Sequence, residues 1–209
     1  MNIPNTITMA RLLLTVVVFL CLQLAPVGLV SASSGGAPSG GAASGAVAQV
    51  DATLAWIAFA MFLVAAFSDF LDGYLARKWN MVTAFGRIAD PFADKILISG
   101  TLIMLLQFSA ASTVLTHWYV VVVIAREFLV TAIRGYVEST GQEFGADRLG
   151  KWKMVSQCWT VGAVLSMVAG SSMLVWAAHG GFWVSLALTV VSGLNYVLKA
   201  RKLIVGTGI

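Results

Sequence analysis

The chain has few cysteines and histidines, the residues that form disulfides in small extracellular domains or bind zinc. Its 209 residues include two cysteines, Cys21 and Cys158, and two histidines. The cysteines lie in separate apolar runs, and no Cys-x-x-Cys pair or Cys/His cluster occurs. A disulfide framework and a structural zinc site are therefore not expected. Acidic residues are also scarce, with nine in the whole chain, so each needs an explanation of its own.

Polar residues are scarce overall, because 59% of the chain is hydrophobic, whereas a soluble domain is nearer half apolar. Apolar runs of about 20 residues suffice for a helix to cross a ~30 Å hydrocarbon core, and barrel strands would instead alternate over ~10 residues. Six runs are visible: Thr8–Val30, Ala52–Arg77, Thr83–Ala111, Val114–Ser139, Lys151–Ala178 and Phe182–Leu203. The sequence predicts an all-α integral membrane protein, a single domain over residues 1–209 with six transmembrane helices. Residues 1–11 are predicted to form a short N-terminal interfacial helix.

Lysine and arginine are absent from every second connection between the runs, namely 31–51, 109–117 and 178–182. All thirteen basic residues lie at the opposite ends of the runs, which predicts that both termini face the cytoplasm from the inner membrane. Residues 31–48 are uncharged and rich in Gly, Ser and Ala, which is typical of a flexible loop, here outside the cytoplasm. The net charge of +4 suits an anionic lipid surface, and no nucleic-acid partner is expected.

The first apolar run has an alternative interpretation as a secretory signal peptide. Arg11 precedes it, and Val30-Ser31-Ala32 resembles a small-residue cleavage site. The run is about 19 residues long, however, and exceeds the usual apolar region of a signal peptide. We therefore interpret it as a retained membrane span.

Four of the nine acidic residues lie close together at the inner ends of the second and third runs: Asp69, Asp72, Asp90 and Asp94. Carboxylates at membrane depth are costly and usually mark a functional site. Their i,i+3 and i,i+4 spacings place each pair on one face of its helix. A short connection at 78–82 makes the two helices antiparallel neighbours. Together the two faces predict a four-carboxylate site for hard divalent cations. The structural alternative is a salt-bridge network with Arg77, Arg87 and Lys95.

The spacing of these residues also resembles a family signature. The pattern Asp69-x2-Asp72-Gly73-x2-Ala76-Arg77-x8-Gly86-x3-Asp90-x3-Asp94 is similar to that of the CDP-alcohol phosphatidyltransferases. Segments 2–11, 124–134 and 150–154 resemble members of this family whose acceptor is sn-glycerol 3-phosphate. The resemblance implies a six-helix membrane homodimer that transfers a phosphatidyl group from CDP-diacylglycerol to an alcohol and releases CMP.

The resemblance further implies roles for individual residues. The four aspartates would hold one or two Mg²⁺ or Mn²⁺ ions, and Asp94 would also act as the general base. The residues implied in binding the CDP group are Gly73, Ala76, Arg77, Thr8 and Arg11.

A cationic patch is expected for the phosphate of the acceptor. Arg126 and Arg134 are eight residues apart and share a helix face, while Lys151 and Lys153 open the fifth run. Such residues bind phosphate through charge-assisted hydrogen bonds. The alternative is that they anchor the helices at the membrane surface or pair with Glu127, Glu138 and Asp147.

Other functions remain open at this stage. The same chemistry could use inositol phosphate, serine or phosphatidylglycerol as the acceptor. A cation-coupled transporter could use the aspartates as ion sites, although no internal repeat is visible. An inactive scaffold would not require the intact motif.

Overall fold

The computed structural model describes residues 3–25, 50–79, 84–139 and 148–206. Every regular element of this part of the chain is a helix, which confirms the predicted all-α class. The helices are α1 (Ile3–Leu24), α2 (Ala52–Trp79), α3 (Ala84–Leu105), α4 (Ser109–Ser112), α5 (His117–Ser139), α6 (Arg148–Val168) and α7 (Val175–Gly206).

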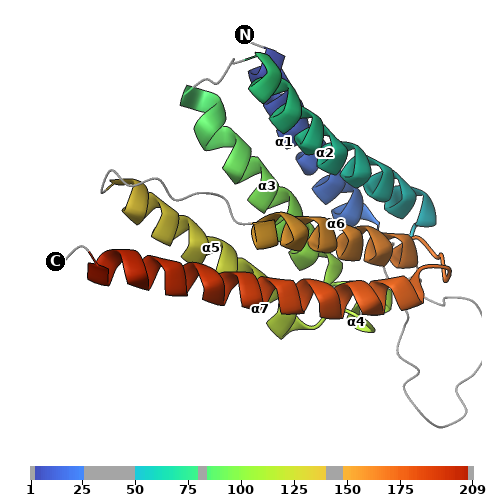
Figure 1. Ribbon diagram of the computed structural model, residues 1–209. Coiled ribbons are helices and arrows are strands. Elements are labelled where there is room, and N and C mark those ends of the chain that lie inside the picture. The colour runs from blue at the N-terminus through green and yellow to red at the C-terminus, as the bar shows by residue number, and fades with distance from the viewer. Residues whose placement is uncertain (1–2, 26–49, 80–83, 140–147, 207–209) are drawn as a thin grey trace, which may run out of the picture.

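The long helices form two antiparallel pairs that are joined by the remaining two helices (Figure 1). α1 lies beside α2, and α6 lies beside α7. α3 contacts α1, α5 and α6, while α5 packs against α7. In Figure 1 the start of α1, the end of α2 and the start of α3 lie at the top, and α5 and α7 end at the left. The helix ends that carry the basic residues are therefore gathered in one half of the molecule.

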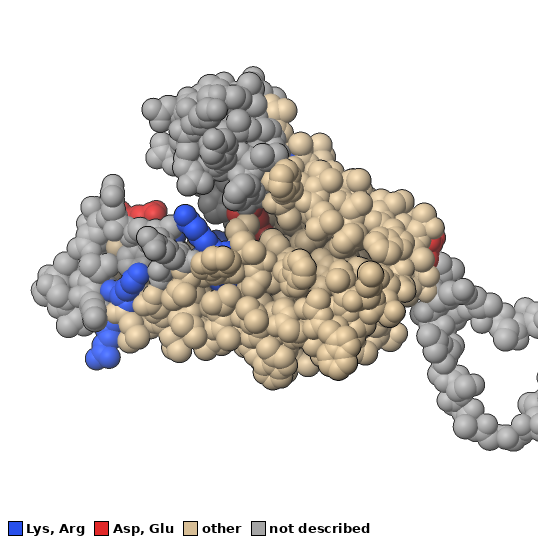
Figure 2. All heavy atoms as spheres, turned by 45° about the vertical axis from the view of Figure 1, so that its right-hand side comes forward, with Lys and Arg blue, Asp and Glu red and all other residues tan. Residues whose placement is uncertain are grey.

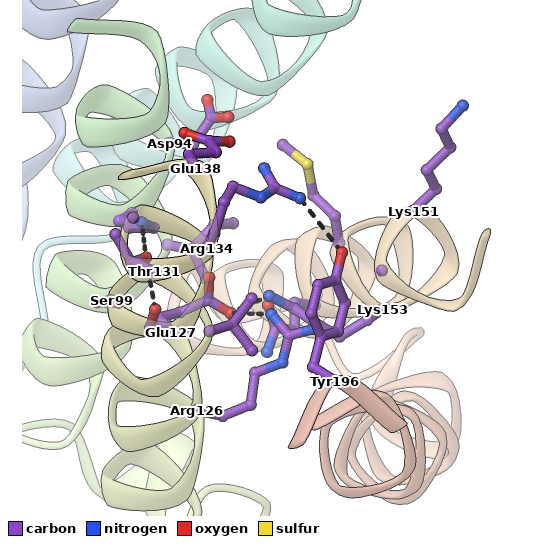
Figure 3. A pocket seen from close by; sticks show the side chains of 17 residues that line it. Asp94, Ser99, Arg126, Glu127, Thr131, Arg134, Glu138, Lys151, Lys153 and Tyr196 are labelled. Carbon is purple, nitrogen blue, oxygen red and sulfur yellow. Dashed lines mark hydrogen bonds and ion pairs between the residues drawn. The ribbon is translucent and has the colours of Figure 1, made fainter. Parts of the chain in front are cut away.

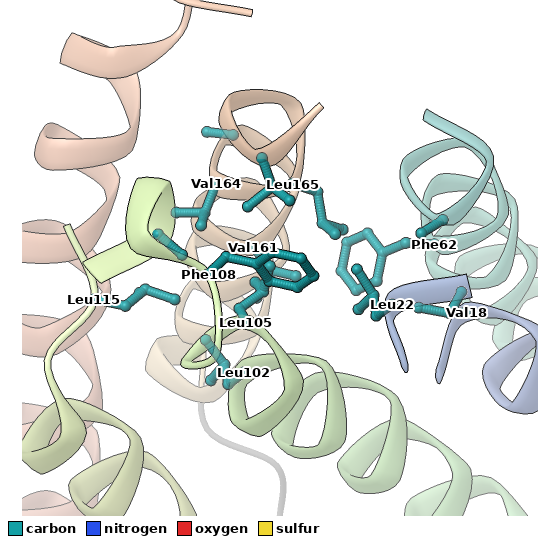
Figure 4. Close-up of a cluster of buried hydrophobic side chains, with 14 of the residues drawn as sticks. Val18, Leu22, Phe62, Leu102, Leu105, Phe108, Leu115, Val161, Val164 and Leu165 are labelled. Atoms are coloured by element: carbon teal, nitrogen blue, oxygen red, sulfur yellow. The ribbon is translucent and has the colours of Figure 1, made fainter. Parts of the chain in front are cut away.

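A cluster of buried apolar side chains holds α1, α2, α3 and α6 together (Figure 4). Leu22 of α1, Phe62 of α2 and Leu165 of α6 are fully buried within it. Phe108 and Leu115, which flank the short α4, complete the cluster on one side. The cluster lies away from the charged half of the molecule. It fixes the angle at which α3 enters that charged half.

The turn between α6 and α7 lies earlier than the sequence pattern predicted. The predicted connection at 178–182 is inside α7, and the chain turns at 169–174 instead. Gly170 makes this turn with φ +93°, a conformation that glycine adopts without steric cost. Gly181 has another use: a Cβ there would lie 2.9 Å from Thr160 Oγ1, so its small size lets α7 approach α6 closely.

Two other predicted boundaries also change. The predicted N-terminal interfacial helix is not a separate element, because α1 continues without a break from Ile3 to Leu24. Pro4 lies in its first turn, where its missing N–H removes no helical hydrogen bond. The third predicted run does not stay helical to Ala111 either. α3 ends at Leu105, and the extended backbone of Phe108 separates it from α4.

Only α7 meets the length and composition expected of a membrane-crossing helix among the residues described. Its segment Val175–Arg201 has 27 residues, whereas the apolar segments Thr8–Leu24 and Ala52–Ser68 are shorter. The predicted number of six membrane spans is therefore not confirmed by this measure. The predicted loop at 31–48 lies outside the described residues.

The surface places apolar side chains outward and polar side chains inward. On α7, Val191, Leu194 and Leu198 are each more than half exposed, while Ser185, Thr189 and Ser192 on the opposite face are fully buried. In Figure 2 the Lys and Arg atoms gather toward one end, and most of the remaining visible surface is uncharged. Exposed apolar side chains opposite buried polar side chains on α7 are typical of a helix that faces lipid.

Candidate active site

A pocket of about 500 Å³ opens between α3, α5, α6 and α7 in the charged half of the molecule. Figure 3 shows how its polar side chains converge from these helices. Five cationic and three acidic side chains line it: Lys95, Arg126, Arg134, Lys151, Lys153, Asp94, Glu127 and Glu138. The structure thus brings Asp94 of α3 together with all four residues predicted to bind the acceptor phosphate, which lie on α5 and α6.

Helical periodicity explains why these side chains reach one space. On α5 the lining residues Arg126, Val130 and Arg134 are four residues apart, so they form one stripe along the helix. On α6 the lining residues Lys153 and Gln157 are also four residues apart. The contact of α3 with both α5 and α6 then closes the pocket on the side of Asp94.

Two of the pocket's cations share one carboxylate. Arg126 Nη1 lies 3.2 Å from Glu127 Oε1, and the Lys153 ammonium forms an ion pair with the same oxygen. The side chains of Arg126, Glu127 and Lys153 are 10%, 16% and 7% exposed, so this group is largely shielded from water. The alternative of a structural pairing with Glu127 is therefore partly confirmed. It does not exclude phosphate binding, because one carboxylate cannot neutralise two cations.

Arg134 has a different environment. Its Nη2 donates a hydrogen bond to the Tyr196 hydroxyl on α7 over 3.2 Å, and Figure 3 shows the two side chains meeting at the pocket. Its Nε atom is buried, and the described residues provide no hydrogen-bond partner for it. A guanidinium group with an unused buried donor beside a pocket is suited to receive an anion.

Asp94 is held from the other side by α1. Arg11 is completely buried, and its Nη1 atom lies 3.1 Å from Asp94 Oδ1. The Asp94 side chain keeps 30% of its surface exposed and lines the pocket. Arg11 therefore restricts the orientation of this carboxylate, which remains accessible from the pocket.

Among the lining residues, Lys95 was expected only as a possible partner of the aspartates, and Tyr196 was not predicted as a site residue. The Lys95 ammonium donates a hydrogen bond to Thr131 Oγ1 on α5, which joins α3 to α5 beside Asp94. Tyr196 lies in the last apolar run, where a tyrosine would ordinarily be assigned to the membrane interface. Its position seven residues after Thr189 and four after Ser192 marks a buried polar stripe on α7, which is a signal that could have found it.

Three of the four predicted metal ligands, Asp69, Asp72 and Asp90, have side chains outside the described residues. Within the described part, no group of three or more His, Cys, Asp or Glu side chains is placed to hold a metal ion. The backbone of α2 and α3 is nevertheless helical at all four aspartates, and the two helices contact each other. Four carboxylates on two adjoining helices are donors suited to Mg²⁺ or Mn²⁺, so the donor set fits and the metal site stays a prediction.

The residues predicted to bind the CDP group are only partly visible. The surroundings of Gly73, Ala76 and the Arg77 side chain lie outside the described residues. Thr8 and Arg11 are both buried on α1, and Arg11 reaches Asp94. Their assignment to the nucleotide stays a prediction, and the geometry adds that Arg11 contacts a candidate catalytic residue.

Comparison with known proteins gives a consistent result across most of the chain. The family model described as CDP-alcohol phosphatidyltransferase matches residues 1–191. A protein of Bacillus subtilis named CDP-diacylglycerol–glycerol-3-phosphate 3-phosphatidyltransferase is 38% identical over 200 residues, which cover 95% of this chain and 94% of that protein. A protein of the same name from Rickettsia felis is 33% identical over 144 residues, covering 68% and 77%. One from Haemophilus influenzae is 29% identical over 151 residues, covering 70% and 78%.

Proposed function

Because the chain belongs to the CDP-alcohol phosphatidyltransferase family, we propose that it transfers the phosphatidyl group of CDP-diacylglycerol to sn-glycerol 3-phosphate. The products are phosphatidylglycerol phosphate and CMP, and the reaction belongs to phospholipid biosynthesis. A hydroxyl oxygen of the acceptor forms a bond to the phosphorus that carries diacylglycerol, and the bond from this phosphorus to CMP breaks. The observation that carries the proposal is the pocket that Asp94 lines together with five cationic residues.

The four aspartates Asp69, Asp72, Asp90 and Asp94 would hold one or two Mg²⁺ or Mn²⁺ ions. Such ions, when bound, neutralise pyrophosphate oxygens and stabilise CMP as it leaves. Without cations, four clustered carboxylates would repel one another. The helical spacing of the aspartates and the contact between α2 and α3 support this assignment.

Asp94 is the proposed general base, because its carboxylate is oriented by Arg11 and lines the pocket. It would take the proton of the acceptor hydroxyl as the oxygen bonds to phosphorus. Arg11 restrains the carboxylate from α1, so this helix contributes to the geometry of the reacting atoms. Gly73, Ala76 and Arg77, with Thr8 and Arg11, would border the CDP group.

The acceptor phosphate would bind to Arg126, Arg134, Lys151 and Lys153. Arginine offers a planar set of donors that matches phosphate oxygens, and lysine adds a mobile positive charge. Lys151 is exposed and extends outward in Figure 3, where it could guide an anion toward the pocket. A neutral acceptor such as serine would not need this excess of positive charge, which favours a phosphorylated alcohol.

The chain would span the inner membrane six times through its long helices, with the pocket facing the cytoplasm. The membrane-length segment of α7, the exposed apolar side chains and the gathering of basic residues in one half support this orientation. The family resemblance also suggests a homodimer. The mass of the purified protein in detergent, measured by light scattering, would test that state.

One assay tests the function directly. Purified protein is incubated with CDP-diacylglycerol, Mg²⁺ or Mn²⁺, and either glycerol 3-phosphate, serine, inositol phosphate or phosphatidylglycerol, and CMP release is measured. We expect release with glycerol 3-phosphate and its loss when the metal is chelated. Release with serine but not with glycerol 3-phosphate would contradict the proposed acceptor.

A further inference from the structure

The face of α7 that meets α5 is matched to the two arginines of the pocket. Ser192 and Tyr196 are one helical turn apart on α7, and both are buried. Arg126 Nη2 donates to Ser192 Oγ over 3.0 Å, and Arg134 Nη2 donates to the Tyr196 hydroxyl over 3.2 Å. One turn of α7 thus contacts two guanidinium groups that lie two turns apart on α5.

Tyr196 contacts both arginines through different parts of its side chain. Its hydroxyl accepts the hydrogen bond from Arg134, while the guanidinium carbon of Arg126 lies 5.7 Å from the centre of its ring. That distance is within the range of a cation–π interaction. The tyrosine is 3% exposed and has only two side-chain torsions, so it is a rigid contact for two flexible side chains.

A phenol restrains an arginine without neutralising it. Arg126 is paired with the carboxylate of Glu127, whereas Arg134 forms no ion pair with any carboxylate that the structure describes. Both arginines keep a buried Nε atom without a hydrogen-bond partner in the described part of the chain. Tyr196 therefore leaves the charge and an N–H donor of Arg134 available to an anion in the pocket.

We propose that Tyr196 is a positioning residue for the anionic acceptor. It orients Arg134, and secondarily Arg126, so that their guanidinium groups bind the acceptor phosphate. The inference rests on the proposed function and adds a determinant of acceptor affinity from α7, which contributes none of the residues predicted to bind substrate. Preorganised donors raise affinity because less ordering is needed on binding.

The test compares Tyr196→Phe, Tyr196→Leu and the control Tyr136→Phe. Tyr136 lies on α5, is 51% exposed and does not line the pocket. Tyr196→Phe keeps the ring and removes the hydroxyl, so we expect the KM for glycerol 3-phosphate to rise roughly three- to tenfold. The KM for CDP-diacylglycerol and kcat should change less than twofold. Tyr196→Leu removes both contacts and should raise the same KM further.

A second readout uses inorganic phosphate as a competitor of glycerol 3-phosphate. Its inhibition constant should rise in Tyr196→Phe in step with the KM of the acceptor and stay unchanged in Tyr136→Phe. An acceptor KM within twofold of wild type in Tyr196→Phe would overturn the inference, as would equal losses for both substrates. If the wild-type protein releases no CMP with glycerol 3-phosphate, the proposed acceptor is wrong. The wild-type assay alone shows this, without the variants.

Discussion

Arg134 lines the pocket and Arg11 contacts it through Asp94, and the charges of these two arginines have different surroundings. Arg11 on α1 is fully buried and lies 3.1 Å from a carboxylate oxygen of Asp94. Arg134 on α5 is hydrogen-bonded to the neutral hydroxyl of Tyr196. Arg11 is paired with a carboxylate, whereas Arg134 forms no ion pair with the carboxylates that the structure describes. The difference predicts that Arg11 holds an acidic residue in place and that Arg134 is available to a substrate anion.

The charges of Arg126 and Lys153 are intermediate between those of Arg11 and Arg134, because they are balanced in part. Both pair with Glu127, so the three side chains together retain one positive charge. Arg126 also donates to Ser192 on α7. This trio therefore joins α5, α6 and α7 and still contributes attraction for an anion.

The difference between Arg11 and Arg134 is tested most strongly by removing the carboxylate that Arg11 contacts. Asp94→Asn keeps the size of the side chain and removes the proposed base, so we expect kcat to fall roughly 1,000-fold. CMP release with saturating substrates measures the loss. Asp51→Asn is the matched control, because Asp51 caps α2 through the N–H of Thr53 and is not among the pocket's lining residues.

The thermal unfolding temperature in detergent must accompany this measurement, because Asp94→Asn also removes the charge that faces the buried Arg11. A variant that stays folded and inactive supports the role of Asp94. A variant with wild-type kcat would remove Asp94 from the reaction.

Arg134→Ala tests the other side of the comparison. Loss of a charge-assisted hydrogen bond should raise the KM for glycerol 3-phosphate roughly 10- to 100-fold, with little effect on the KM for CDP-diacylglycerol. Arg201→Ala is the control, because Arg201 is exposed on α7 and does not line the pocket. Equal increases for both substrates would show that Arg134 does not distinguish the acceptor.

Glu127→Gln tests whether the intermediate trio is structural. The substitution leaves Arg126 and Lys153 largely buried without their carboxylate, so we expect the free energy of unfolding to fall by about 2 kcal/mol. Adding Lys153→Met removes one of the two unbalanced charges and should recover part of that loss. Unfolding of the wild type and of the single and double variants gives the coupling between the two positions. A single variant as stable as the wild type would contradict the structural role.

The helical class was predictable because apolar runs of this length admit few alternatives to a helix. The boundary between α6 and α7 was not. Gly170, Gly180 and Gly181 look alike in the sequence, yet Gly170 makes the turn and Gly181 lies at the contact between α6 and α7. Which glycine turns the chain depends on the neighbouring helix, and local composition does not contain that information.

The pocket shows the same limit. The spacing of Arg126 and Arg134 predicted that they share a face, and the structure places them together with Lys151 and Lys153. The polar stripe on α7 could have marked Tyr196, but its contacts with the two arginines could not be predicted. They depend on how α7 packs against α5, and Arg134 and Tyr196 are 62 residues apart in the chain. The contact of Arg11 with Asp94 was equally hidden, because the resemblance implied only that Arg11 binds the CDP group.

Gly193→Ala is the mildest test of how the arginines contribute, because it displaces the Arg126 side chain without removing a charge. A Cβ at position 193 would lie 3.2 Å from Cγ of Arg126, which is closer than ordinary van der Waals contact. The Arg126 side chain can move a few tenths of an ångström, so we expect the KM for glycerol 3-phosphate to rise about twofold with stability nearly unchanged. Gly180→Ala is the control, because nothing lies within 4 Å of a Cβ there.

Since Arg134 lies two turns away on α5, its contact with Tyr196 should survive the substitution. Adding Gly193→Ala to Arg134→Ala should then multiply the two effects on KM, and a combined effect no larger than that of Arg134→Ala alone would mean that the two arginines act as one unit.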